Sequence, residues 1–242
     1  IVRIVASGIC HTDIKFRDTV PKPVVLGHEG SGIVEKIGGS VTRVAVGDPV
    51  VLTFGFCGKC PSCESGAPTH CADHHALQFK GARLDGSTPL SQNGAPIHGA
   101  FFQQSSFATH AVATERNAIP VSADAPLEML GPLGCGIQTG AGAILNSLNV
   151  AYGSKVAVFG TGAVGLSAVM AASAAGAAQI VAVDVVPSRL ELARDLGAHD
   201  VIDARDGDVA ERVRDVTNGG VNYALETAAV ESSFAAAIAS LT

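Results

Sequence analysis

A glycine pattern at the end of an apolar run, VAVFGTGAVG at residues 156–165, constrains the fold of this chain more than any other stretch. Gly160, Gly162 and Gly165 form the pattern G-x-G-x-x-G, which joins a buried strand to a helix. The first glycine permits a tight turn, the second lets a pyrophosphate approach the backbone, and the third allows close helix packing. The pattern therefore predicts a dinucleotide-binding βαβ unit.

The next apolar run, QIVAVDV at residues 179–185, contains an acidic residue where such a unit contacts the ribose. Asp184 follows Gly165 by 19 residues, and its carboxylate can accept hydrogen bonds from both ribose hydroxyls of the adenosine. The same charge would repel a 2′-phosphate, so Asp184 predicts a preference for NAD over NADP. The alternative is a glycine-rich turn that serves only helix packing. It is disfavoured because the apolar strand, the glycine pattern and the acidic residue all fit a dinucleotide-binding unit.

The pattern of the whole chain changes near residue 130. Residues before it form short β segments broken by Gly and Pro, whereas from Lys155 onward apolar strands alternate with Ala-rich helical stretches. We expect a mostly-β domain over residues 1–138 and a doubly wound parallel-sheet (Rossmann) domain over residues 139–242. The Gly-rich segment 127–150 is the expected helical connection. Both domains are expected to be incomplete, because the chain opens within a strand pattern and ends after a fourth strand.

Charge and composition restrict the partners. A net charge of −6 with only 16 Lys and Arg in 242 residues disfavours nucleic acid and anionic membranes, so the ligand is expected to be small. Residues 156–183 carry no charge, but their many Ala and Gly residues fit a buried strand, turn and helix better than a membrane span. No signal peptide is recognisable. Six cysteines, mostly clustered, indicate metal binding in a reducing compartment, so we expect a cytoplasmic protein.

Four of the cysteines lie in one short segment, CGKCPSCESGAPTHC at residues 57–71. Their spacing, C-x2-C-x2-C-x7-C, departs from that of iron–sulfur ferredoxins, in which the third cysteine is followed by x3-C-P. Disulfides between such close neighbours would be strained. A tetrahedral zinc site needs only four thiolates on a short, easily wrapped loop, so zinc is favoured. The predicted ligands of this structural site are Cys57, Cys60, Cys63 and Cys71.

The two remaining cysteines, Cys10 and Cys135, lie in separate Gly-containing turns, and each alone is more typical of a buried apolar residue than of a ligand. A third element changes this interpretation, because the segment from Gly27 to Val41 matches G-H-E-x2-G-x5-G-x2-V at every fixed position. With this motif, the chain resembles the zinc-containing medium-chain alcohol dehydrogenases. Segments 101–112 and 129–148 look closest to the aryl-alcohol (benzyl alcohol) dehydrogenase branch.

The resemblance implies a GroES-like catalytic domain followed by a Rossmann domain, with two zinc ions and NAD as cofactors. It implies catalytic zinc ligands at Cys10, His28 and Cys135, a proton relay at Thr12, and carboxylates supporting the site at Asp13 and Glu29. It further implies that Phe101 lines the substrate pocket. The implied cofactor contacts are His11, Thr139, Gly160, Gly162, Val164, Gly165, Asp184 and Arg189. One departure is Lys15, which stands where animal enzymes finish the relay with a histidine.

The implied reaction is the reversible, NAD-dependent oxidation of a primary, aromatic alcohol to its aldehyde, carried out by a homodimer or homotetramer. A glutathione-dependent formaldehyde dehydrogenase is a rival within the family, although the basic residues that would bind the glutathione carboxylates are not obvious. Members of the family are normally about half as long again as this chain. The alternative to an enzyme is therefore a truncated, inactive protein that binds zinc and a dinucleotide.

Overall fold

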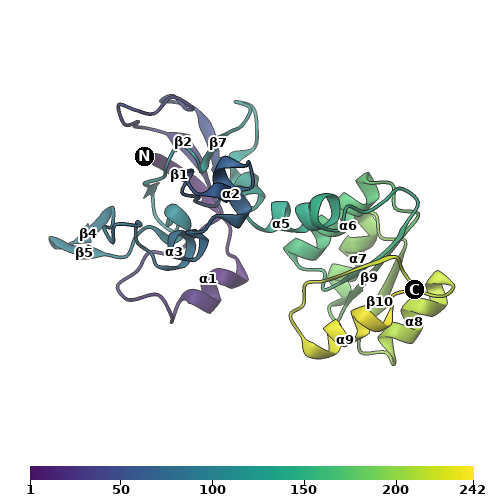
Figure 1. Ribbon diagram of the computed structural model, residues 1–242. Coiled ribbons are helices and arrows are strands. Elements are labelled where there is room, and N and C mark those ends of the chain that lie inside the picture. The colour runs from purple at the N-terminus through teal and green to yellow at the C-terminus, as the bar shows by residue number, and fades with distance from the viewer. The chain divides into compact units, whose positions relative to one another are not determined.

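The change of sequence pattern near residue 130 separates two units in the computed structural model, which describes residues 1–242. One unit comprises Ile1–Cys135 and the other Gly136–Thr242 (Figure 1). The boundary expected after residue 138 lies inside helix α5 (Gly136–Gly142), which belongs to the second unit. Each unit has its own buried apolar cluster, as is usual for separate domains.

The first unit is built on a five-stranded antiparallel sheet with the strand order β6-β1-β2-β3-β7. The strands are β1 (Val2–Ser7), β2 (Gly30–Val34), β3 (Pro49–Leu52), β6 (His110–Ala111) and β7 (Ala118–Pro120). Apolar side chains of these strands form a buried cluster of Val2, Val34, Val50, Leu52, Ala111 and Ala118. The prediction of a mostly-β first half is confirmed.

Short helices and a hairpin, which the sequence pattern did not predict, connect these strands. The helices are α1 (His11–Phe16), α2 (Pro61–Glu64), the 3-10 helix η1 (Pro68–His70) and α3 (His74–Phe79). Strands β4 (Leu90–Gln92) and β5 (Ala95–Ile97) form the hairpin, and the 3-10 helix η2 (Phe101–Gln103) follows it. Aromatic side chains join these pieces, since Phe16 of α1 stacks on Phe79 of α3 with ring centroids 4.5 Å apart.

The Gly-rich segment between the halves is helical, as predicted. It comprises α4 (Leu127–Leu130), the 3-10 helix η3 (Gly131–Gly134), α5 and the π-helix η4 (Ala143–Ser147). Thr53 donates its hydroxyl proton to the carbonyl of Gly134 at 3.2 Å, which ties the end of η3 to the chain just after β3. This hydrogen bond holds the neighbouring Cys135 in the first unit.

The second unit contains a parallel sheet with the strand order β10-β9-β8-β11. Its strands are β8 (Lys155–Phe159), β9 (Gln179–Asp184), β10 (Asp200–Asp203) and β11 (Tyr223–Glu226). They alternate with the helices α6 (Ala163–Ala174), α7 (Pro187–Asp195), α8 (Val209–Thr217) and α9 (Glu231–Ala239). The predicted alternation of strands and helices and the Rossmann architecture are confirmed.

Both faces of the parallel sheet are buried, because successive side chains of a strand point to opposite faces. Val156 and Val158 of β8 pack in a cluster with Ala168 and Ala172 of α6. Ala157 and Phe159 of the same strand pack instead in a cluster with Val213 of α8 and Ala237 of α9. This double burial explains the long uncharged stretch, which forms β8, α6 and most of β9.

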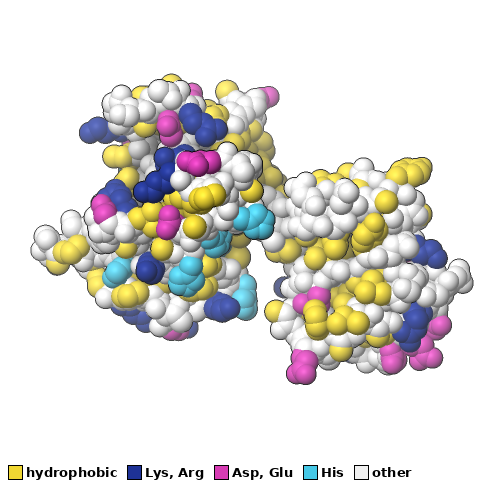
Figure 2. Space-filling view, viewed as in Figure 1, with side chains coloured by type: hydrophobic (Ala, Val, Ile, Leu, Met, Phe, Trp, Pro, Cys, Tyr) yellow, Lys and Arg dark blue, Asp and Glu magenta, His cyan; other side chains and the backbone are white.

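The exposed side chains are of mixed kinds. On the face shown in Figure 2, basic and acidic side chains are interspersed on both units, and histidine side chains gather on the first unit. No helix combines the length and apolar composition needed to span a bilayer.

Candidate active site and metal centres

The glycine turn between β8 and α6 leaves room for a phosphate group at the start of the helix. A Cβ atom on Gly165 would lie 1.8 Å from the carbonyl oxygen of Gly160, so only glycine permits this close packing. Gly160 itself has a φ of +87°, whereas a Cβ on Gly162, the N-cap residue of α6, would meet no atom within 4 Å. No side chain caps the helix. The first N–H groups of α6 therefore face an open space suited to an anion.

Thr227, which follows β11, closes this turn from the other side. Its hydroxyl lies 2.8 Å from the carbonyl oxygen of Gly160 and 3.0 Å from that of Phe159. No sequence pattern predicts this role, because Thr227 lies 67 residues beyond Gly160 and belongs to no motif.

Asp184 lies at the end of β9, beside the glycine turn, and only 7% of it is exposed. One carboxylate oxygen accepts hydrogen bonds from the N–H and hydroxyl of Thr161, at 2.6 and 2.9 Å. The other accepts from the N–H groups of Val185 and Val186, at 2.7 and 2.9 Å. Burial raises the pKa of Asp184, but these hydrogen bonds outweigh burial and hold the pKa below its usual value. The carboxylate is therefore ionised, and the protein itself already engages both oxygens.

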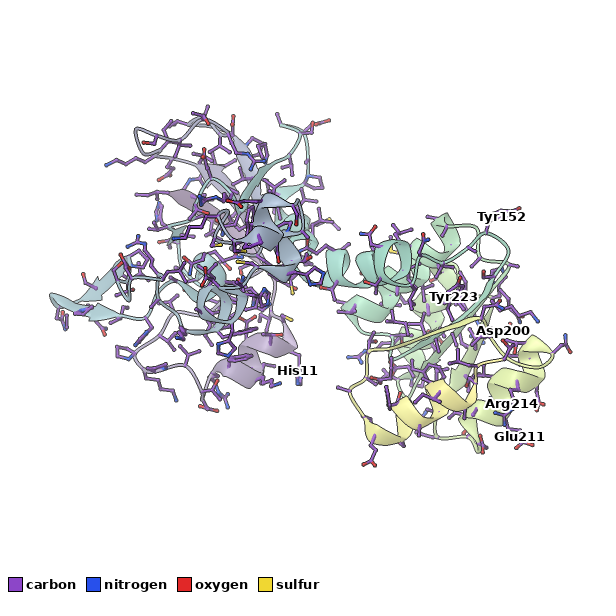
Figure 3. All side chains as sticks on the ribbon, viewed as in Figure 1. His11, Tyr152, Asp200, Glu211, Arg214 and Tyr223 are labelled. Carbon is purple, nitrogen blue, oxygen red and sulfur yellow. The ribbon has the colours of Figure 1, made fainter.

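The remaining residues expected to contact a cofactor lie in several elements. Thr139 is on α5, and a Cβ on its neighbour Gly140 would lie 2.0 Å from the carbonyl oxygen of Val164, so α5 and α6 are in close contact. Arg189 is exposed in the first turn of α7. His11 is exposed at the start of α1 in the first unit (Figure 3).

The four clustered cysteines converge on one point. The sulfur atoms of Cys57, Cys60, Cys63 and Cys71 all lie within 4.8 Å of one another, and these residues are free thiols. The N–H groups of Cys57 and Ala72 donate to the sulfurs of Cys71 and Cys60, at 3.4 and 3.5 Å. Such N–H donors stabilise thiolates, and hydrogen bonds from the backbone of Ala72 and Cys63 lower the pKa of Cys60 to about 6. Four converging sulfurs fit a tetrahedral zinc ion with no open position.

A second cluster brings together residues that are distant in the sequence. The sulfur atoms of Cys10 and Cys135, a ring nitrogen of His28 and a carboxylate oxygen of Glu29 all lie within 4.8 Å of one another. Cys10 is the N-cap residue of α1, His28 and Glu29 precede β2, and Cys135 follows η3. We call these four residues the mixed cluster.

His28 is fully buried, and the two nitrogens of its ring have different surroundings. Nδ1 lies 3.0 Å from a carboxylate oxygen of Asp13, whereas Nε2 is buried without a hydrogen-bond partner. A buried nitrogen without a partner is costly unless it coordinates a metal, and the carboxylate on the other nitrogen fixes the tautomer that coordination requires. The histidine ring therefore fits a metal ligand in the mixed cluster.

Asp13 also organises the backbone around the cluster. One carboxylate oxygen accepts from the N–H of Gly27 at 3.0 Å as well as facing the ring of His28, and the other accepts from the N–H of Cys10 at 3.1 Å. The carboxylate is 3% exposed. A single buried side chain thus fixes both the loop that carries His28 and the start of α1 that carries Cys10.

The pKa values of the mixed cluster diverge strongly. A hydrogen bond with Cys135 lowers the pKa of Cys10 to about 3, and the nearby ring of His28 and the N–H and hydroxyl of Thr12 lower it further. Burial lowers the pKa of His28, but the hydrogen bond to Asp13 and the contact with Cys10 raise it to about 9 overall. The pKa of Cys135 is raised, first by Cys10 and then by burial. Ionisable groups this close together retain protons because their negative charges would otherwise repel one another. A bound divalent cation would neutralise these charges in place of the protons.

Two further residues expected in the site have different surroundings. Thr12 lies in α1 beside the sulfur of Cys10. Phe101 has no exposed surface, and its ring packs edge-on against His28 with centroids 5.8 Å apart. Phe101 thus supports the histidine from within the core in this structure, and its role in lining a substrate pocket stays a prediction. Lys15 is exposed on α1.

Two family models match the two units. Residues 1–123 match the alcohol dehydrogenase GroES-like domain, and residues 163–242 match the zinc-binding dehydrogenase domain. Geraniol dehydrogenase of Castellaniella defragrans is 47% identical over 99% of this chain and 65% of its own length.

Solved structures agree with this match. An alcohol dehydrogenase zinc-binding domain protein from Burkholderia ambifaria is 55% identical with a TM-score of 0.96, and benzyl alcohol dehydrogenase from Acinetobacter calcoaceticus is 49% identical with a TM-score of 0.93. Each comparison covers 99% of this chain but 66% of the other protein. The chain thus spans about two thirds of the length of these relatives, and it belongs to the zinc-containing medium-chain alcohol dehydrogenase family.

Proposed function

We propose that this chain carries the zinc and cofactor sites of an enzyme that oxidises a primary alcohol to its aldehyde with NAD. The observation that carries this proposal is the mixed cluster, in which two cysteine sulfurs surround a buried imidazole nitrogen that lacks a hydrogen-bond partner. Three protein ligands with one position left for substrate are typical of catalytic zinc, whereas four cysteines are typical of structural zinc.

In this proposal Cys10, His28 and Cys135 hold the catalytic zinc, and the four clustered cysteines hold the structural one. Zinc at the mixed cluster supplies a Lewis acid that lowers the pKa of an alcohol beside it. The carboxylate of Glu29 reaches the same cluster and contributes negative charge there. Asp13 keeps the imidazole of His28 in the tautomer that leaves Nε2 available.

Thr12 moves the proton. Its hydroxyl lies within hydrogen-bonding reach of the sulfur of Cys10, so it is next to the expected position of the alcohol. The threonine oxygen would accept the hydroxyl proton of the alcohol and release its own proton to a ribose hydroxyl, and from there to water. The exposed Lys15 replaces the histidine that ends the relay in animal enzymes, so solvent is the proposed final acceptor.

The second unit holds the cofactor in this proposal. The start of α6 offers N–H groups and an open space beside Gly162 for the pyrophosphate. The ionised Asp184 would share its lone pairs with the adenosine ribose hydroxyls and repel a 2′-phosphate, which favours NAD over NADP. A bound NAD would supply the acceptor for the hydride that the alcohol loses, and the hydroxyl proton would leave by way of Thr12, so the products would be the aldehyde, NADH and one proton.

The substrate proposed is an aromatic primary alcohol. Benzyl alcohol and geraniol, which appear in the names of two similar proteins, are both primary alcohols whose carbinol carbon is attached to an unsaturated carbon. An apolar pocket separates such alcohols by only about 10- to 200-fold, so a terpenoid alcohol is the nearest rival. Cysteine ligands must stay reduced, which favours a reducing compartment. Assembly into dimers or tetramers is proposed from the family resemblance alone.

A substrate series tests this proposal. The ratio kcat/KM is measured for benzyl alcohol, geraniol and ethanol, with NAD and with NADP. We expect benzyl alcohol with NAD to give the highest ratio and ethanol to fall at least tenfold below it, because a small alcohol loses apolar contacts. A higher ratio with geraniol would indicate a terpenoid rather than an aromatic substrate. Absence of turnover with every alcohol would contradict the proposed function.

A further inference from the structure

A segment with an unusual backbone lies against the loop that carries His28. In residues 101–107, which we call the clamp segment, Phe102, Gln103 and Ser105 have φ angles of 51°, 56° and 50°. Residues other than glycine rarely adopt these left-handed conformations, and those that do cluster at functional sites. The neighbours of this segment must therefore stabilise it, and they include the chain on either side of His28.

Backbone and hydroxyl groups of the clamp segment pair with the chain leading to His28. The hydroxyl of Ser105 donates to the carbonyl of Val25 at 2.6 Å. The N–H of Phe107 donates to the carbonyl of Leu26, and that of Ser106 donates to the carbonyl of Gly27, both at 3.0 Å. The clamp segment thus binds the carbonyl of each of the three residues before His28.

At the cluster itself, a side chain continues this pairing. The amide nitrogen of Gln104 donates to the carbonyl of His28 at 2.9 Å, and its amide oxygen accepts from the N–H of Gly30 at 3.2 Å. The same amide nitrogen lies 3.3 Å from the carbonyl oxygen of Thr53, which follows β3. Only 1% of Gln104 is exposed, so these bonds are shielded from water.

The amide of Gln104 acts like a peptide group of an additional strand. In a parallel pair, one residue bonds the carbonyl before and the N–H after the residue opposite it. Gln104 does the same around Glu29, because it bonds the carbonyl of His28 and the N–H of Gly30. Both polar ends of the side chain are used, and both act on the backbone that carries two members of the mixed cluster.

Gly30 makes this approach possible. A Cβ atom at Gly30 would lie 3.1 Å from the amide oxygen of Gln104 and 2.7 Å from the Cβ of Ser106. The second distance is shorter than real Cβ contacts, so any side chain here would push the clamp segment away. The first residue of β2 and the glutamine of the clamp segment therefore fit each other.

The clamp segment also restrains the ring of His28. Phe102 stacks on it with centroids 4.3 Å apart and planes inclined by 20°. Stacking restricts the tilt of the imidazole, while Asp13 fixes its rotation through Nδ1. The left-handed φ of Phe102 is part of this arrangement, because it belongs to the turn from which both Phe102 and Gln104 approach His28.

We propose that Gln104 is a positioning residue of the catalytic metal centre, and this role rests on the proposed function. Its amide fixes the peptide groups on both sides of Glu29, and thereby the points from which His28 and Glu29 reach the mixed cluster. Gln104 touches neither substrate nor cofactor in this role. Its loss would leave the ligands present but less well placed, which typically lowers metal affinity by about 10- to 100-fold.

The test substitutes Gln104→Met, which keeps the length of the side chain but removes its donors and acceptor. Metal release from the purified, zinc-loaded protein to a competing chelator is followed over time, and Co²⁺ is then exchanged into the protein for absorption spectroscopy. We expect zinc of the mixed cluster to leave about tenfold faster, while zinc of the four-cysteine site keeps its rate. The ligand-field bands of Co²⁺ in the mixed cluster should shift, because their positions depend on ligand geometry.

The matched control is Gln103→Met, one residue away. The amide nitrogen of Gln103 donates to the carbonyls of Leu77, Ala82 and Ala100, so this change also removes buried hydrogen bonds, yet none of them belongs to the mixed cluster. We expect this variant to lose thermal stability but to keep both metal-release rates and the Co²⁺ spectrum. Gln104→Asn, which retains the amide but shortens the side chain, replaces Gln104→Met if that variant fails to fold, with the same expected loss.

Two results would overturn the positioning role. One is unchanged metal release and an unchanged Co²⁺ spectrum in the Gln104 variants. The other is an equal effect of the Gln103 and Gln104 variants on both metal sites, which would indicate general loosening of the fold. A wild-type protein that binds a single metal ion per chain would instead contradict the proposed function itself, and with it any role of Gln104 at a second metal.

Discussion

Asp13 shows how much of the mixed cluster depends on one residue outside it. Its carboxylate contacts the ring of His28 and accepts from the backbone N–H groups of Cys10 and Gly27. These three contacts join α1 to the loop before β2, so two predicted ligands share a single support. Charge is needed as well as shape, because the carboxylate must hold a proton on Nδ1 of His28 to keep Nε2 available.

The substitution Asp13→Asn should therefore weaken metal binding without removing a ligand. An amide keeps the size of the side chain but loses the charge and one acceptor, so we expect zinc affinity at the mixed cluster to fall about 10- to 100-fold. Equilibrium competition with a chelator measures this affinity. Asp18→Asn, an exposed change that removes only surface ion pairs with Arg17 and Lys22, is the control and should leave zinc affinity unaltered. Equal affinities in wild type and the Asp13 variant would contradict this account.

Among the elements of the second unit, the glycine turn after β8 is held by hydrogen bonds to the end of strand β9. Asp184 at the end of β9 holds the N–H and hydroxyl of Thr161 in the glycine turn, and it also holds the N–H groups of the two residues leading into α7. The turn is therefore shaped in advance of any ligand. Ribose would have to share this carboxylate with the protein, which links cofactor binding to the order of the turn.

The lowered pKa of Asp184 gives a pH dependence of stability. Because the folded pKa lies below the unfolded value of about 3.9, the ionised carboxylate stabilises the fold above that pH, and this contribution is lost as pH falls through the folded pKa. Asp184→Asn lacks the contribution. We expect the difference in free energy of unfolding between wild type and this variant to be largest above about pH 4 and to shrink in more acidic buffer.

Urea unfolding at a series of pH values measures that difference. Asp195→Asn, on the exposed surface of α7, is the control and should follow the wild-type profile. A stability difference for Asp184→Asn that stays constant across the acidic range would contradict an ionised, hydrogen-bonded carboxylate.

The sequence predicted those parts of the site that depend on local spacing. Gly160, Gly162 and Gly165 mark a turn whose geometry follows from neighbouring residues, and the four cysteines of residues 57–71 lie close enough to converge on their own loop. The parallel strands followed from continuous apolar runs. Cys10, His28 and Cys135 needed the family resemblance, because nothing in their spacing indicates that three distant turns meet.

The remaining parts depend on tertiary contacts that leave no periodic signal. Gln104 lies 76 residues from His28, and a buried glutamine looks like any polar residue in a loop. Thr161 occupies a variable position of the glycine pattern, yet its hydroxyl bonds Asp184. Phe101 is fully buried against His28, a contact that no sequence pattern indicated, and its expected place beside a substrate stays a prediction.

At the scale of the whole molecule, the two units divide the chemistry. The first unit contains both groups of side chains that could bind a metal, and the second contains the glycine turn and Asp184. Each site is assembled largely within its own unit, so each can be tested by its own readout. The two metal clusters also separate cleanly, since four cysteines form one and the other two cysteines join His28 and Glu29 in the other.

The most direct test of the account is the zinc content of the wild-type protein and of Cys135→Ala, measured together with NADH formation from benzyl alcohol. We expect two zinc ions per wild-type chain, with NADH production. We expect one zinc ion, an intact fold and no NADH for the variant, because only the mixed cluster loses a ligand. A Cys135→Ala protein that keeps both zinc ions and its activity would contradict the assignment of the mixed cluster as the catalytic centre.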